Sequence, residues 1–123
     1  MSMRIPVRTR TIAAGGLFTT VCLILASSPF QSSADDEKAK MELGRKIFTQ
    51  TAVPQCGVCH TLADAGTSGT IGAKLEELKP DATRVANAVR DGVGIMPSYR
   101  ESLTDEQIQA VAYYVSRAAA GTQ

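Results

Sequence analysis

The stretch Cys56-Gly57-Val58-Cys59-His60 carries more information than any other part of this 123-residue chain. Two cysteines three positions apart, followed at once by a histidine, form the C-x-x-C-H motif at which c-type haem is attached. On a single helical turn both thiols lie within reach of one porphyrin edge, where they add to the two vinyl groups as thioethers. We therefore predict one covalently bound haem c with one iron. Cys56 and Cys59 would hold the ring, and His60 would be the proximal iron ligand.

Three other kinds of site use paired cysteines. A zinc site needs about four ligands, usually from two such pairs, but the chain has three Cys and one His, and Cys22 lies in a segment that we expect to be removed. A thioredoxin-like redox pair belongs in a βαβ unit, and no strand pattern flanks the motif. A structural disulfide between Cys56 and Cys59 remains an alternative, although the pentapeptide as a whole favours haem.

The first 34 residues have the organisation of a secretory signal peptide. The positive start contains no acidic residue and carries Arg4, Arg8 and Arg10. Residues 11–26 are mostly apolar, and Ser32-Ser33-Ala34 offers small residues for cleavage before an acidic stretch. A retained membrane anchor is the alternative. However, this segment is only 16 residues long and is interrupted by Gly and Thr, whereas a spanning helix needs about 20 apolar residues. We expect residues 1–34 to be cleaved, without a membrane anchor in the mature protein.

The remaining domain, residues 35–123, is expected in the periplasm, because c-type haem is attached outside the bacterial cytoplasm. Removal of three arginines leaves 10 basic and 12 acidic side chains, a formal charge of −2, which argues against nucleic-acid binding. The domain has no Trp and few other large apolar side chains, so its core is thin for its size. A buried macrocycle would supply the missing apolar surface, which independently supports a bound cofactor.

Helical periodicity runs through this domain, and no segment shows the alternation of a strand. We therefore predict an all-α fold, with three main helices and a short one around the haem. The expected elements are a helix over about 36–50 ended by Pro54, a short turn at Leu75–Leu78 closed by Pro80, a helix from Asp81 to Gly92, and a last helix from Thr104. Asp81 is an N-cap candidate, and Thr104 with Gln107 forms a capping-box pattern.

A six-coordinate haem needs a second axial ligand. His60 is the one histidine of the chain, so a second histidine from the same chain is excluded. The domain after the signal peptide offers two methionines, of which Met41 falls on the first helix, where packing is favoured. Met96 lies in a loop between Gly94 and Pro97, and we predict it as the sixth ligand, with gap-filling packing as the alternative. A neutral thioether stabilises ferrous iron and raises the reduction potential.

From Gly44 to Arg117 the chain resembles a small bacterial class I cytochrome c with His/Met ligation. Gly44 and Phe48 match the Gly-x-x-x-aromatic pair of the family's first helix. Val111 and Tyr114 match the apolar and aromatic positions of its last helix, and the resemblance implies that the two helices cross at these residues.

The segment that leads to Leu75 departs from the family pattern. Ala73 stands where the family usually has the proline of a Gly-Pro-x-Leu segment. The resemblance implies that the backbone carbonyl at this position accepts a hydrogen bond from the proximal histidine. Alanine can present the same carbonyl on a less rigid loop.

Two shorter stretches, Gly-Thr-Ile-Gly at 69–72 and Gly-Ile-Met-Pro-Ser-Tyr at 94–99, also resemble small cytochromes that accept electrons from periplasmic sulfite dehydrogenases. The resemblance implies a monohaem electron carrier that is not an enzyme. Its donor would be a dehydrogenase, such as a sulfite dehydrogenase, and its acceptor a terminal oxidase or another cytochrome. Partners would dock at the exposed haem edge near the C-x-x-C turn.

Two alternatives to the free carrier stay open. One is a haem subunit held permanently on a dehydrogenase. The other is a gas-binding sensor, which would apply if Met96 does not ligate the iron. The candidates for contact with the haem propionates are Arg84, Arg90, Arg100 and Tyr99.

Overall fold

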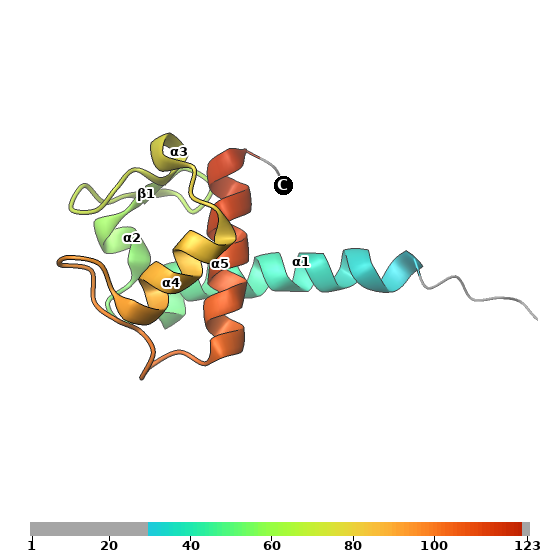
Figure 1. The fold of residues 1–123 in the computed structure, drawn as a ribbon. Helices are drawn as coiled ribbons and strands as arrows, with labels where there is room; N and C mark the ends of the chain where they lie inside the picture. The colour runs from blue at the N-terminus through green and yellow to red at the C-terminus, as the bar shows by residue number, and fades with distance from the viewer. Residues whose placement is uncertain (1–29, 122–123) are drawn as a thin grey trace, which may run out of the picture.

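A computed structural model describes residues 30–121 of the chain (Figure 1). In chain order the elements are α1 (Phe30–Lys46), the π-helical turn η1 (Ile47–Thr51), α2 (Cys56–Cys59), β1 (Thr61–Leu62), β2 (Thr67–Ser68), α3 (Leu75–Leu78), α4 (Ala82–Asp91) and α5 (Asp105–Ala120). Most of the expected signal peptide, residues 1–29, lies outside the described residues. None of the helices within 30–121 has the length and apolarity needed to cross a membrane.

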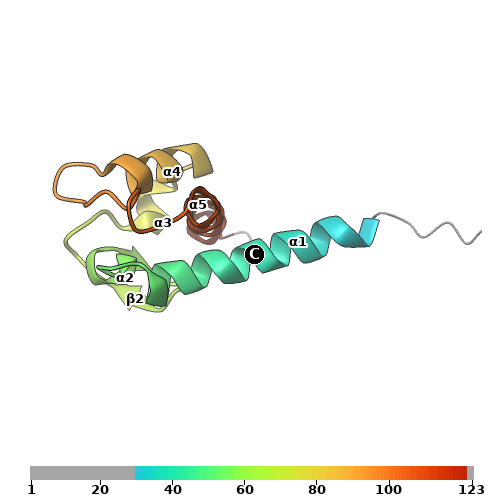
Figure 2. The same ribbon diagram turned by 90° about the horizontal axis from the view of Figure 1, so that it is seen from below.

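The first helix begins earlier than the sequence predicted. We expected it to start near Asp36, but α1 starts at Phe30, so that expectation was wrong by six residues. The sequence contains neither Gly nor Pro between Pro29 and Gly44, and nothing local stops the helix over that distance. The first turns of α1 extend away from the other helices, and their side chains from residue 33 to 40 are exposed (Figures 1 and 2).

The ends of α4 and α5 follow the predicted capping chemistry. The Asp81 carboxylate accepts a hydrogen bond from the Arg84 backbone N–H at 2.8 Å, which confirms the N-cap of α4. Gly92 ends this helix with a φ of +77°, in the region that glycine adopts readily. The Thr104 hydroxyl accepts from the Gln107 N–H, and the Gln107 side chain accepts from the Thr104 N–H, which confirms the capping box of α5.

A small hairpin follows the C-x-x-C-H motif, where the sequence predicted no strand. β1 and β2 pair antiparallel, with Thr61 opposite Ser68 and Leu62 opposite Thr67. Strands of two residues are too short to show an alternating pattern, which is why the sequence analysis missed them. The Thr67 hydroxyl accepts from the Leu62 N–H at 3.1 Å and lies 3.0 Å from the His60 carbonyl oxygen, to which it can donate. The hairpin is thereby attached to the motif.

The core forms where α1 crosses α5, as the family resemblance implied. Gly44 lies directly against the Ala110 carbonyl and the Tyr114 side chain, a close approach that a Cβ atom would prevent. One turn later, the buried Phe48 ring meets the Tyr114 ring edge-on, with centroids 6.0 Å apart and planes at 63°. α4 packs on α5 as well, so α5 is the central helix of the domain (Figure 2).

Candidate haem site

A cavity of about 1520 Å³ lies between α2 on one side and α4 with its following loop on the other. In Figure 2, α4 and α2 lie at the top and bottom of the domain, and α5 is seen end-on beside α4. The apolar part of the lining comes from η1, α3, α4 and α5 and includes Phe48, Leu75, Val85, Val89, Val111 and Val115. A hollow of this size and apolarity suits a large flat macrocycle.

The four side chains that the sequence predicted as the haem site, namely Cys56, Cys59, His60 and Met96, all line this cavity. They come from two segments on opposite walls. The donor set fits haem c, because two thiols and an imidazole lie on one wall and a thioether on the other.

Cys56 and Cys59 occupy the single turn of α2, and both are half-buried with their sulfurs unjoined. Burial raises the pKa of the Cys56 thiol to about 11, an effect partly offset by a backbone hydrogen bond and increased by the neighbouring Cys59. Before any thioether forms, the free Cys56 thiol therefore stays protonated at neutral pH.

The orientation of His60 is set by a backbone carbonyl. Its Nδ1 atom lies 2.8 Å from the Ala73 oxygen. Because a carbonyl oxygen can only accept, Nδ1 must carry the proton, and Nε2 keeps its lone pair for a metal. The hydrogen bond that the family resemblance implied is thus present, although Ala73 replaces the usual proline.

Two glycines to which the sequence analysis gave no structural role, Gly69 and Gly72, pack against the motif. A Cβ on Gly72 would lie 2.5 Å from His60 Cε1 and 2.8 Å from Nδ1, so the Gly72 backbone packs against the imidazole ring. A Cβ on Gly69 would lie 2.6 Å from the Val58 oxygen, close against α2. The Gly- and Thr-rich sequence from 66 to 72 indicates a loop but not what that loop contacts.

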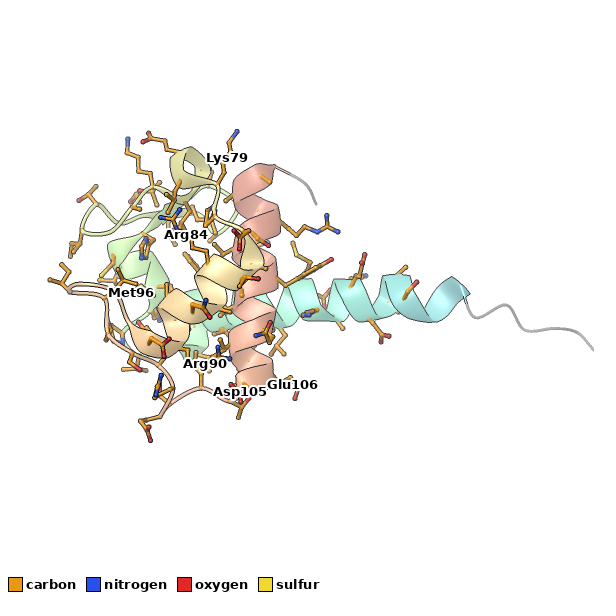
Figure 3. All side chains as sticks on the ribbon, viewed as in Figure 1. Lys79, Arg84, Arg90, Met96, Asp105 and Glu106 are labelled. Carbon is orange, nitrogen blue, oxygen red and sulfur yellow. The ribbon has the colours of Figure 1, made fainter. Side chains whose placement is uncertain are left out.

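Met96 is presented by a tight loop after α4 and is half-buried (Figure 3). The Val93 N–H donates to the Met96 oxygen at 3.2 Å, and the Met96 N–H donates to the Val93 oxygen at 3.0 Å. Gly94, at φ +59°, makes the turn between them. Met41 packs against the core cluster and is not part of the cavity lining, in agreement with the packing role expected for it.

The four propionate candidates separate into two pairs. Arg84 and Tyr99 line the cavity, whereas Arg90 and Arg100 do not. Arg90 forms an ion pair with Asp105 at 3.0 Å, and Arg100 forms one with Asp91. Figure 3 shows Arg90 beside Asp105, away from Met96.

Tyr99 has a different polar partner from the one considered in the sequence analysis. Its hydroxyl donates to the Pro54 carbonyl oxygen at 2.7 Å, and the residue is 4% exposed. Burial, with smaller contributions from Cys56 and Cys59, raises the pKa of the Tyr99 hydroxyl to about 12. The phenol therefore stays protonated and donates throughout the physiological pH range.

Three large apolar side chains at the rim of the cavity are exposed to solvent. They are Ile71, Val93 and Ile95, and they come from both walls. An apolar group of this kind around a site is typical of a contact surface for another protein.

Comparisons with known proteins agree with this geometry. The family model described as cytochrome C oxidase, cbb3-type, subunit III, matches residues 39–115. Cytochrome c6 from Leptolyngbya boryana is 32% identical over 76 residues, which cover 58% of this chain and 85% of the relative. Cytochrome c6 from Bryopsis maxima is 29% identical over 85 residues, which cover 61% of this chain and 88% of the relative.

A solved structure is more similar in sequence. The c-type cytochrome SorU from Sinorhizobium meliloti is 56% identical, with a TM-score of 0.65, over 67% of this chain and 93% of that one. The mostly helical fold described above is therefore one already seen around a c-type haem.

Proposed function

Because the chain belongs to the small class I c-type cytochromes, whose members carry one covalently bound haem c, we propose that it is a periplasmic carrier of single electrons and not an enzyme. Cys56 and Cys59 would hold the ring through thioethers, and His60 and Met96 would be the two side chains that ligate the iron. The observation that carries the proposal is that these four side chains, from two distant segments, line one cavity. When bound, the haem supplies an iron that alternates between the ferrous and ferric states.

The residues of the chain have two tasks in this proposal. The Ala73 carbonyl holds the proton of the His60 ring on Nδ1, so that Nε2 would be the atom that binds the iron. The thioether of Met96 is neutral and favours ferrous iron, which keeps the potential high. With both His60 and Met96 as ligands, the iron would have no open position for oxygen or peroxide, and the apolar lining would limit the access of water.

Replacement of the two methionines tests the axial assignment. A thioether bound to ferric iron gives a weak absorption band near the red end of the spectrum. We expect Met96→Ala to abolish this band and to lower the reduction potential, because the ligand that favours ferrous iron is lost. Met41→Ala is the matched control and should keep both. A band that survives in Met96→Ala, or that disappears in Met41→Ala, would contradict the assignment.

Covalent attachment is tested by extraction with acidified acetone. The colour should stay with the protein, since thioethers resist this treatment. Cys56→Ser and Cys59→Ser should each lose one link, which the pyridine haemochrome spectrum reports as one unreacted vinyl group. Extraction of the haem from the wild type would rule out both thioethers.

For the electron donor we propose a periplasmic sulfite dehydrogenase. The support is the resemblance of residues 69–72 and 94–99 to small cytochromes that accept electrons from such enzymes. Ile71, Val93 and Ile95 at the cavity rim suit a small, transient contact between redox partners. Ferric protein mixed with a sulfite dehydrogenase should be reduced on addition of sulfite, and not when the enzyme is omitted. A lack of reduction in the complete mixture would count against this donor.

One observation favours a second arrangement, in which the domain is a permanent subunit of a larger complex. The matching family model is named after a subunit of an oxidase. Purification from the native source distinguishes the two arrangements. A free carrier should elute from size-exclusion chromatography at the size of one small domain, whereas a permanent subunit should co-elute with its enzyme.

A further inference from the structure

We infer that Tyr99 is a positioning residue that latches the loop carrying Met96 to the opposite wall of the haem cavity. The latch is the hydrogen bond from the Tyr99 hydroxyl to the Pro54 carbonyl oxygen. The inference rests on the proposed function, because it assumes that Met96 is an axial ligand.

Apart from this bond, the hydrogen bonds of the Met96 loop, residues 92–99, are all local. Its backbone is tied to the end of α4, where the Tyr99 N–H donates to the Val89 oxygen at 2.9 Å. The Ser98 hydroxyl donates to the Arg90 oxygen at 2.6 Å. Within residues 30–121, every hydrogen bond of the loop other than that of the Tyr99 hydroxyl ends between residues 88 and 103. These contacts shape the loop and fasten it to its own wall.

The Tyr99 hydroxyl is the exception, because it reaches a segment 45 positions away in the sequence. Pro54 lies two residues before Cys56, on the wall that carries both cysteines and His60. The Tyr99 ring is 4% exposed and lines the cavity together with Pro54 and Met96. One side chain thus joins the wall with the attachment motif to the wall with the sixth ligand.

The Tyr99–Pro54 hydrogen bond should reduce how often the Met96 thioether leaves the iron. A thioether held by a loop dissociates when the loop swings outward, and that movement must break the Tyr99–Pro54 hydrogen bond. Phenylalanine keeps the buried ring but removes the donor, so the loss of one neutral hydrogen bond should raise the opening constant about fivefold. The Met96 loop would keep its local shape, since the bonds to α4 are untouched.

Carbon monoxide measures this opening in the reduced, haem-loaded protein, because it can bind only after the thioether has left. We expect the wild type to bind it slowly and Tyr99→Phe to bind it about fivefold faster. Tyr114→Phe is the matched control: its hydroxyl is also that of a buried tyrosine and donates to Asp64 at 2.5 Å, but it lies on α5 and not on the loop. Ser98→Ala is a second control, since it removes a loop hydrogen bond that does not cross the cavity.

Denaturant unfolding of each variant separates loop opening from general loss of stability. The latch is supported if Tyr99→Phe alone accelerates carbon monoxide binding, although Tyr114→Phe loses at least as much stability because its bond to a carboxylate is the stronger of the two. It is overturned if Tyr99→Phe binds at the wild-type rate, or if Tyr114→Phe or Ser98→Ala accelerates binding equally. A wild type without the ferric thioether band would refute Met96 ligation itself, and the latch with it. If the wild type has this band but Tyr99→Phe binds carbon monoxide at the wild-type rate, the latch alone is refuted.

Discussion

Replacing Gly44 with alanine sets two physical effects against each other. Inside an exposed helix this change stabilises by about 1 kcal/mol, because alanine loses less backbone entropy than glycine. Gly44 is buried at the crossing of α1 and α5, where an added Cβ would overlap the Ala110 carbonyl oxygen. The same atom would lie 2.5 Å from Tyr114 Cβ, closer than real Cβ contacts come. The neighbour at the first contact is backbone, which cannot rotate away, so α1 itself must shift.

The shift outweighs the gain in helix propensity. Forcing extra volume into a packed site typically costs about 1–3 kcal/mol, and contact with backbone belongs at the upper end of that range. Subtracting about 1 kcal/mol for propensity leaves a net loss of about 2 kcal/mol. For a domain of this size that corresponds to a fall of about 8–16 °C in the melting temperature.

Thermal unfolding of the haem-loaded protein, followed by far-ultraviolet circular dichroism, measures this loss. Ala39→Gly is a suitable control, because residue 39 is exposed in the same helix and should report propensity alone, at most about 1 kcal/mol. If Gly44→Ala melts at or above the wild-type temperature, the two helices do not approach each other closely at Gly44.

Three further predictions follow from the packing and from the N-terminal sequence. Phe48→Ala removes a ring that is 2% exposed and should lower the free energy of unfolding by about 3–5 kcal/mol in denaturant unfolding. As a control, Val53→Ala, at an 81% exposed residue, should stay within about 0.5 kcal/mol of the wild type. Equal stabilities of the two variants would show that Phe48 is not a core residue. Gly72→Ala should push the His60 ring aside and shift the reduction potential while the haem stays covalently bound, and an unchanged potential would argue against the contact. N-terminal sequencing of the mature protein should begin at Asp35, whereas a membrane-bound chain that keeps its first residues would indicate an anchor.

Local chemistry made the haem motif and the helix caps predictable. The spacing of Cys56, Cys59 and His60 is read within five residues, and no tertiary information is needed to recognise it. Asp81 and Thr104 bond to backbone groups three residues ahead, so their roles are also encoded locally. Met96 could be proposed as the sixth ligand because Met41 is the one other methionine after residue 34 and His60 is already used.

Contacts between distant segments account for what the sequence analysis missed. Gly69 and Gly72 look like ordinary loop glycines until the fold brings them against α2 and the His60 ring. The Tyr99 hydroxyl finds its acceptor 45 positions away, and no local pattern indicates that partner. Likewise, Arg84 could not be separated from Arg90 by composition, because the difference lies in the ion pair that holds Arg90 outside the cavity.

Exposure of the reduced wild-type protein to carbon monoxide at neutral pH tests the central claim most directly, namely that protein side chains fill both axial positions of the iron. We predict that the reduced spectrum changes little and slowly, because the Met96 thioether must leave before carbon monoxide can bind. Rapid conversion to the carbon monoxide spectrum would show an open axial position. That result would contradict the simple electron carrier and favour the gas-binding sensor.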